Sequence, residues 1–444
     1  MSAALQLTRS VGRWSLAALM LNTVIGVSLF GLPSLLAGYL GRFSPLAYLV
    51  TGAGIATVAV CLAEVSSQFR QAGGPYLYAR AAFGPFVAIQ IGWFTWLTRI
   101  VSCAAGTNLF IAYLSRFLPI VDTGMWRMIV AGLLILGLAV VNYIGVTFGV
   151  RVNNLFALTK ILIVLVFVIA GLFALLVQPG VRVSPLDVPI TTGSWLSAVL
   201  LMMYSFAGFE AALLVSGETR NPRDDAPVAL LVALFTATIL YVAVQYVVMH
   251  TLPAAMNSTK PVADAAQRIL GSVGASLITG GALISAFGYV SANMLHTPRL
   301  TFAMAEQRDF PAVFGIVHPR FRTPSASIVA FAMLVFSFST AGDFKMNATL
   351  AAVSRIFVYA SIAAALPILR RKNPQAEAFR VKGGIFFTVA ALLFTSLLAF
   401  GIPPSGWVFM LTASFLALLN WHGTRRKSRS SEEVFASESH RPHL

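Results

Sequence analysis

Four ionisable side chains lie inside long apolar stretches of the sequence, where a charge is costly and a functional role is the default expectation. They are Arg99, Lys160, Glu210 and Arg355. Groups of this kind can pair with one another, bind backbone carbonyls or exchange protons. Histidines such as His296 show no metal-ligand spacing, and the sequence has no nucleophile–base constellation and no phosphate-binding loop. We therefore predict no metal, no cofactor and no enzymatic activity.

Helix-breaking residues interrupt two of these apolar stretches. The first, "NTVIGVSLFGLPS" (22–34), contains Gly26 and Pro33, and the second, "MMYSFAGFEAALLVSGETRNPRDDAP", places Gly208 beside Glu210. In hydrocarbon, a broken helix is tolerated only where it lines protein or a water-filled cavity. For either stretch taken alone, close packing or a simple kink is the alternative. Two interrupted spans at corresponding positions of two halves predict an inverted-repeat transporter with its site at the bilayer midplane.

Composition indicates that the elements positioning these residues are membrane helices. The chain has 444 residues, is 58% hydrophobic and only 10% charged, with a mean hydropathy of +0.81, whereas soluble domains carry about a quarter charged residues. A lipid-spanning helix needs roughly 20 mostly apolar residues. Such runs predict twelve spans, at about 14–39, 46–68, 86–115, 127–148, 154–177, 195–217, 227–250, 272–297, 325–341, 347–369, 384–402 and 405–422.

The positions of the basic residues, which give the chain its net charge of +16, predict its topology in the membrane. If the N-terminus is cytoplasmic, 21 of the 31 lysines and arginines fall on inside segments and seven on outside segments. Cytoplasmic loops of membrane proteins carry this excess. We therefore predict a multi-pass protein of the cytoplasmic (cell inner) membrane with both termini in the cytoplasm, and no nucleic-acid partner.

Four stretches of the sequence carry a family resemblance. They are "IGVSLFGLP", "AEVSSQFRQAGGPYLYARAAFG" (63–84), "SFAGFEAALLVSGETRNPRDDAP" and "SANMLHTPRLTFAMAEQRDFP" (291–311). In turn they resemble the first helix, the connection of the second and third helices, the sixth helix with its following loop, and the eighth helix of the amino acid–polyamine–organocation (APC) superfamily of secondary transporters. The likeness covers roughly residues 13–370. The chain departs from it by having Gly-Val-Ser, starting at Gly26, where the family usually has Gly-Ser-Gly.

The resemblance implies an all-α integral membrane protein with the LeuT-type fold of amino acid permeases. This fold has twelve transmembrane helices, arranged as a 5+5 inverted repeat with broken helices 1 and 6, plus two C-terminal helices. The corresponding segments are a cytoplasmic N-terminus (1–13), a first repeat (14–177), a second, inverted repeat (195–370), and helices 11 and 12 (384–422). The cytoplasmic tail (425–444) is polar and short of apolar residues, so we predict that it is disordered.

The resemblance also implies a substrate site formed by the two breaks. The outer half of the first segment would begin near Gly26 to Ser28 with unsatisfied N–H groups, where a carboxylate binds. Unpaired carbonyls near Ile25 and at the matching point of the sixth segment would hold an ammonium group. For the aromatic residues the alternative is ordinary helix packing, and for Asn293 it is an interhelical hydrogen bond. The predicted substrate-binding residues are Ile25, Gly26, Val27, Ser28, Tyr204, Ser205, Phe206, Ala207, Gly208, Phe209 and Asn293.

The intramembrane charges have competing interpretations. Lys160 resembles a fifth-helix lysine of proton-coupled family members, which occupies the space of a sodium ion in relatives, but it could instead snorkel to the interface. Glu210 could accept hydrogen bonds that hold the broken segment, or titrate during the cycle. Arg99 and Arg355 could pair with Glu64 or Glu210, bind carbonyls, or gate the outer path.

The function predicted from these observations is secondary active transport of an amino acid by alternating access, coupled to protons. The alternative within the class is an exchanger of amino acids or polyamines without net ion coupling. A membrane-embedded enzyme or a sensor is a remote alternative, since the chain has only 15 acidic residues, mostly in loops, and a short polar tail. The partners predicted are therefore an amino acid, protons and membrane lipid.

Overall fold

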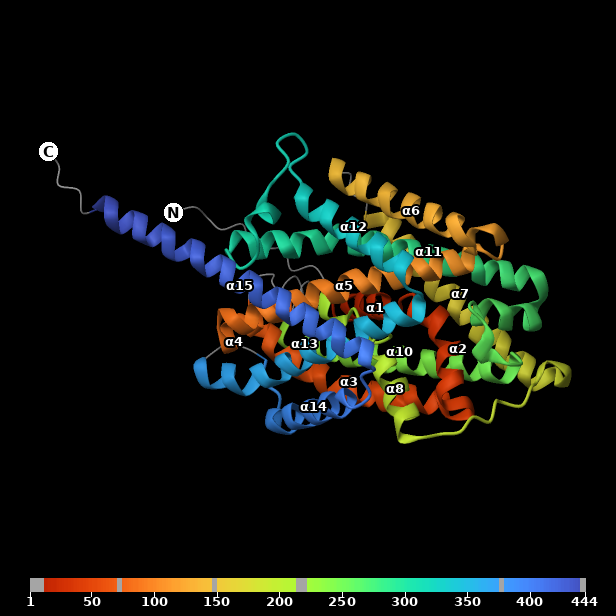
Figure 1. Cartoon of the computed structure of the whole chain (residues 1–444). Helices are drawn as coiled ribbons and strands as arrows, with labels where there is room; N and C mark the ends of the chain where they lie inside the picture. Colours follow the sequence, from red (N-terminus) through yellow and green to blue (C-terminus); the bar gives the residue numbers. More distant parts are fainter. Residues whose placement is uncertain (1–11, 70–73, 146–149, 213–221, 375–378, 440–444) are drawn as a thin grey trace.

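The computed structural model describes residues 12–69, 74–145, 150–212, 222–374 and 379–439. Within these ranges every regular element is a helix, and most of the helices run side by side in one elongated bundle (Figure 1). The α-helices are α1 (Arg13–Val24), α2 (Ser28–Leu40), α3 (Ser44–Ser67), α4 (Gly74–Phe83), α5 (Pro85–Leu114), α6 (Gly124–Ile144), α7 (Val150–Val177), α8 (Thr192–Met202), α9 (Phe209–Ala212), α10 (Pro222–Thr251), α11 (Pro261–Glu306), α12 (Ser325–Ala341), α13 (Phe344–Lys372), α14 (Gly384–Ala399) and α15 (Pro404–Ser439). Short 3₁₀ turns join some of them, at η1 (Gly41–Phe43), η2 (Pro119–Asp122), η3 (Pro179–Val181), η5 (Ala255–Asn257) and η6 (Ala312–Gly315).

Seven described helices are long and apolar enough to cross a membrane, and an eighth span results if α14 and the first part of α15, bent by 115°, are counted together. The structure is therefore that of a multi-pass membrane protein. Every one of the twelve predicted spans contains a described helix. The smaller count arises because α2 and α3 merge into one 40-residue stretch, while α8 and α12 are shorter than a full span.

The helices differ in how deeply they are buried. In α5, 78% of the most apolar 18-residue window is buried, whereas in α6 the share is 22% and in α7 33%. Large apolar side chains project from the outer helices, including Leu133, Ile169 and Leu176. An outward-facing apolar surface of this kind suits lipid rather than water, so α5 lies in the centre and α6 and α7 at the periphery.

The long helix α11 contains one sharp kink. Gly271 takes φ +70°, a left-handed conformation that glycine adopts without steric cost. The kink separates residues 261–270, which follow a loop, from the predicted span that begins at residue 272. The kink therefore leaves the predicted span within the second, longer part of this 46-residue helix.

The ends of the helices sort into two groups. At one end, here called the basic end, side chains join distant segments through these contacts: Arg13 Nε–Asp225 Oδ1 (2.8 Å), Arg80 Nη1–Asp309 Oδ2 (2.8 Å), Lys372 Nζ–Ala81 O (2.9 Å) and Asn420 Nδ2–Asp309 O (2.8 Å). At the opposite end the contacts are Arg42 N–Leu186 O (3.3 Å), Val183 N–His250 O (2.8 Å) and Arg116 Nη1–Asp264 Oδ1 (3.5 Å). Tyr76, in α4 at the basic end, donates a hydrogen bond to Asp309, and burial raises its pKa above the usual tyrosine value.

The C-terminal tail, residues 425–444, stays predicted to be disordered from its polar composition. The helix α15 continues to Ser439 and extends beyond the bundle (Figure 1). Residues 440–444, and 1–11 of the predicted N-terminal segment 1–13, lie outside the described residues.

Candidate functional site

The first interrupted segment breaks at Ile25 to Val27. The helix α1 ends at Val24, Ile25 has a non-helical ψ of 87°, and α2 starts at Ser28 without a side-chain cap. A helix N-terminus without a cap leaves N–H groups that carry partial positive charge. The break predicted for this stretch is therefore present, and of its helix breakers only Gly26 lies in it.

Gly31 and Pro33, by contrast, lie inside α2. A Cβ at Gly31 would lie 2.6 Å from the ring of Phe344, so this glycine permits close approach of α13. Pro33 has no N–H to donate to the carbonyl four residues earlier, so α2 continues through it with one intrahelical hydrogen bond fewer. The Nε2 of Gln245 donates to Pro33 O at 3.1 Å and so joins α10 to α2.

The second interrupted segment breaks between α8 and α9 and touches the first. Gly208 takes φ +105°, and a Cβ built on it would lie 2.4 Å from the backbone oxygen of Thr23. Ser205 Oγ donates to Ser28 Oγ at 3.1 Å. The two breaks, 177 residues apart in the sequence, thus form one unit at the centre of the bundle.

Tyr241 on α10 connects the carbonyls that the breaks leave free. Its hydroxyl lies 2.8 Å from Val24 O and 3.0 Å from Ser205 O, so its single hydrogen is shared by the two acceptors. Sequence reasoning did not single out this residue. From the sequence one can expect that carbonyls freed by a helix break in hydrocarbon need hydrogen-bond donors. This expectation does not say which residue supplies the donor.

Lys160 also binds a carbonyl of the first segment. Its Nζ donates to Asn22 O at 2.7 Å. Lys160 lies ten residues after the start of α7, about 15 Å along the helix at 1.5 Å per residue. This is deeper than the predicted span implies, because α7 begins four residues before that span. The Oδ1 of Asn22 is buried and has no hydrogen-bond partner in the described structure, which leaves one free acceptor next to the break.

Glu210 and Arg355 hold the two ends of the second break. Glu210 Oε2 accepts from Gly208 N at 2.9 Å and from the Tyr359 hydroxyl at 3.4 Å, and Oε1 lies 3.6 Å from Arg99 Nη2. Arg355 Nη1 donates to Met203 O at 3.1 Å. Of the pairings considered from the sequence, Arg99 therefore takes Glu210, and Arg355 takes a carbonyl.

Glu64 pairs with a different arginine. Arg370 binds it through both carboxylate oxygens, at 2.6 and 2.7 Å. Glu64 is fully buried, and its Oε2 also accepts from Val381 N at 2.8 Å. This bidentate pair joins α3 to α13 at the basic end, so Glu64 is not available to the intramembrane arginines.

The aromatic residues of the second break are packed within the bundle. Phe206 contacts Tyr241 with ring centroids 5.5 Å apart, and Phe209 contacts Tyr359 at 5.7 Å. Both phenylalanines are fully buried, which agrees with the packing alternative for them. Tyr204 is also buried, and its ring contacts Phe344 at 6.1 Å.

On α11, Asn293 and Tyr289 differ in their contacts: Asn293 bonds within its own helix, and Tyr289 faces the first break. Asn293 uses its Nδ2 within its own helix, on Tyr289 O at 2.9 Å, and so makes no interhelical bond through that atom. The ring of Tyr289 faces the first break, since a Cβ on Gly26 would lie 3.9 Å from it. A Cβ on Gly106, in α5, would lie 3.0 Å from the same ring. The sequence motif led to Asn293 and missed Tyr289 one helical turn earlier.

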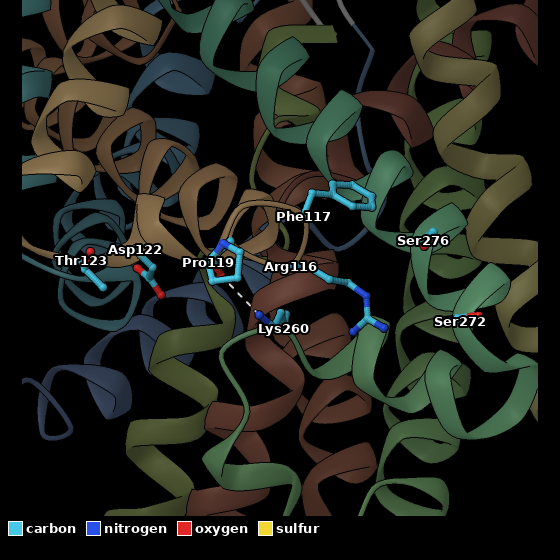
Figure 2. A pocket seen from close by; sticks show the side chains of 9 residues that line it. Arg116, Phe117, Pro119, Asp122, Thr123, Lys260, Ser272 and Ser276 are labelled. Atoms are coloured by element: carbon cyan, nitrogen blue, oxygen red, sulfur yellow. Dashed lines mark hydrogen bonds between the residues drawn. The ribbon is translucent and has the colours of Figure 1, made fainter.

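Two cavities accompany these elements. A small one of about 30 Å³ has room for about two water molecules. It is lined by Pro75, Thr95, Thr98, Arg99, Glu210, Arg355, Val358 and Tyr359. A wide depression of about 710 Å³ lies at the opposite end, where Lys260 Nζ donates to Ser115 Oγ at 3.3 Å (Figure 2).

An all-helical, multi-pass bundle in which two interrupted segments meet is the architecture of a membrane transport protein. The chain belongs to the amino acid permease family, whose model matches residues 11–421. In the part of the chain that the structure describes, no group of three His, Cys, Asp or Glu side chains could hold a metal ion.

Three curated relatives, all from Bacillus subtilis (strain 168), are similar over most of their length. The chain is 28% identical over 393 residues to a methylthioribose transporter, with 84% of each chain covered. It is 25% identical to the serine/threonine exchanger SteT, over 89% of this chain and 94% of the relative. It is 26% identical to the branched-chain amino acid permease BcaP, over 90% and 89%.

Proposed function

We propose that the protein is a secondary transporter that moves an amino acid across the cytoplasmic membrane by alternating access. The observation that carries this proposal is the contact of the two helix breaks, through Ser28 with Ser205 and Gly208 with Thr23. Broken helices that meet at mid-membrane offer N–H groups and carbonyls to a charged substrate. The family and the named relatives, a permease and an exchanger of amino acids among them, support the same function.

The proposal includes twelve spans in a 5+5+2 arrangement, with repeats at 14–177 and 195–370 and two further helices at 384–422. It is supported by the directions of the two broken segments. The first runs from Arg13 at the basic end to Leu40 at the opposite end, and the second runs from Thr192 back toward the basic end. An inverted repeat requires this antiparallel relation.

The zwitterionic part of the substrate would bind at the breaks. Its carboxylate would meet the uncapped N–H groups from Gly26 to Ser28, where the N-terminus of α2 carries partial positive charge. Its ammonium group would bind the carbonyls of the breaks, sharing them with the hydroxyl of Tyr241, and the free Oδ1 of Asn22.

Proton coupling through Lys160 is the proposed energy source. The ammonium of Lys160 holds Asn22 O at the end of α1, so gain or loss of its proton would favour one facing state over the other. Exchange without net ion coupling is the second candidate. The observation that favours it is the similarity to the exchanger SteT.

Uptake into proteoliposomes tests the transport proposal. We expect a pH gradient to drive accumulation of at least one amino acid from a panel of the twenty, without a sodium requirement. Accumulation that needs a preloaded amino acid and ignores the pH gradient would favour the exchanger. No uptake and no exchange of any amino acid, by protein that is monodisperse, would contradict the proposed function.

Single introduced cysteines test the proposed orientation. The native Cys61 and Cys103 are buried, so they should not react. Cysteines replacing Ser184 and Lys260, at the opposite end, should react with an impermeant thiol reagent in intact cells, and one replacing Asn373, at the basic end, should react only after lysis. The reverse labelling would mean that the basic end faces outward.

A further inference from the structure

Two arginines lie in the middle of the membrane-spanning bundle. Arg99 is fourteen residues into the 30-residue α5, and Arg355 is eleven residues into the 29-residue α13. Both are therefore about 17–21 Å from a helix end at 1.5 Å per residue. A charged group at this depth needs a partner or a polar ligand.

The acids around these arginines do not balance their charge. Glu210 lies 3.6 Å from Arg99. Arg355 is 3% exposed, and in the described residues no carboxylate lies within ion-pair distance of it. Its hydrogen bond goes to Met203 O. Two guanidinium groups thus share one carboxylate, which leaves an excess of one positive charge in a medium where an uncompensated ion is unfavourable.

Both arginines border the cavity of about 30 Å³ with donors to spare. A guanidinium carries five N–H donors, and the described structure uses one of those of Arg355. The hydroxyl groups of Thr95 and Thr98 donate to their own helix, at 2.7 Å each. The space holds about two water molecules, which is the room that the two oxygens of a carboxylate take. It is too small for a whole amino acid.

The cavity adjoins the proposed substrate site. Arg355 binds Met203 at the start of the second break, and Glu210 binds Gly208 at its end. Ser205, between them, contacts Ser28 in the first break. A substrate whose carboxylate and ammonium lie at the breaks could therefore extend a short side chain toward the arginines.

We infer that this cavity is an anion site and that it takes the side-chain carboxylate of the substrate, so that the transported molecule is an acidic amino acid. The inference rests on the proposed function. A neutral amino acid brings no net charge and leaves the excess in place. A second carboxylate neutralises it and forms charge-assisted hydrogen bonds, which guanidinium groups make in bidentate geometry.

Binding to the purified full-length protein tests the inference. Calorimetry compares L-aspartate and L-glutamate with L-asparagine and L-glutamine, which have nearly the same size without the charge, each with and without chloride. We expect at least tenfold tighter binding of one acid than of its amide, independent of chloride. Equal affinities for acid and amide would overturn the inference while transport of amino acids stands. Amide binding that requires chloride would also overturn it, since the site would then hold a small anion.

Variants assign the preference to the arginines. Arg99→Gln should reduce affinity for the acid at least tenfold and leave affinity for the amide within about twofold. Arg355→Gln should also reduce affinity for the acid. Because Arg355 also donates to Met203 O, the Arg355→Gln protein could fail to fold, and Arg99→Gln then decides the test. Arg127→Gln is the matched control, because Arg127 lies at the opposite end near Gly342 O. An unchanged acid preference in Arg99→Gln would contradict the inference, and absence of binding by every amino acid would contradict the proposed function itself.

Discussion

Gly208→Ala is expected to reduce uptake to background, at least 100-fold, and to lower the thermal stability of the purified protein. The added Cβ would lie 2.4 Å from the backbone oxygen of Thr23, and residue 208 has φ +105°. Neither the clash nor the backbone strain can be relieved by a side-chain rotation. Strained backbone and steric conflict of this kind cost about 3 kcal/mol or more, and relieving them requires the two broken segments to separate.

Gly26→Ala is the matched control for this prediction. It also lies in a break, yet its Cβ would have ordinary van der Waals contacts, 3.8 Å from Val24 O and 3.9 Å from the ring of Tyr289. It should therefore fold with nearly unchanged thermal stability, and any loss of uptake would report on substrate binding. Gly26→Leu, which fills the space before Tyr289, should abolish substrate binding while the protein remains monodisperse. A Gly208→Ala protein with the stability and uptake of the parent would show that the two breaks need not touch.

Lys160→Met is expected to remove the dependence of uptake on a pH gradient while substrate binding is retained to within about tenfold. Methionine keeps an unbranched side chain, one atom shorter than that of lysine, but cannot donate to Asn22 O, which Lys160 does at 2.7 Å. The hydrogen bond between α7 and the end of α1 would then be absent at every pH, so protonation could not change it. Proteoliposome uptake at fixed outside pH, with the inside pH varied, measures the effect, and binding is measured on the same preparation.

Lys160→Arg separates the hydrogen bond from the proton. Arginine can still donate to Asn22 O but remains charged at every pH that the protein experiences, so it should bind substrate and fail to accumulate it. Lys345→Met is the control, because Lys345 lies over the ring of Tyr39 at 5.1 Å. Accumulation driven by the pH gradient in Lys160→Met, or a strict sodium requirement in the parent, would mean that Lys160 has a structural role only.

Several features of the protein follow from the sequence alone. The 58% hydrophobic composition indicates a membrane protein, because transfer of helices into lipid depends on the summed apolarity of about 20 neighbouring residues. Gly26 and Gly208 indicate the breaks, because the conformational freedom of glycine is a property of the residue itself. The distribution of the lysines and arginines predicts the orientation in the membrane, since topology depends on local charge counts.

Only the tertiary structure decided which groups bind each other. Glu64 could be matched with several arginines from the sequence, and its partner is Arg370, 306 residues away. Tyr241, on α10, supplies the donor for both breaks, although nothing distinguishes it from other tyrosines in apolar spans. Pro33 stays within α2, and the donor to its carbonyl is Gln245, 212 residues away. Hydrophobicity and helix breaking are local and additive, whereas a hydrogen bond or ion pair depends on the distance and angle between helices whose order in space the local sequence does not contain.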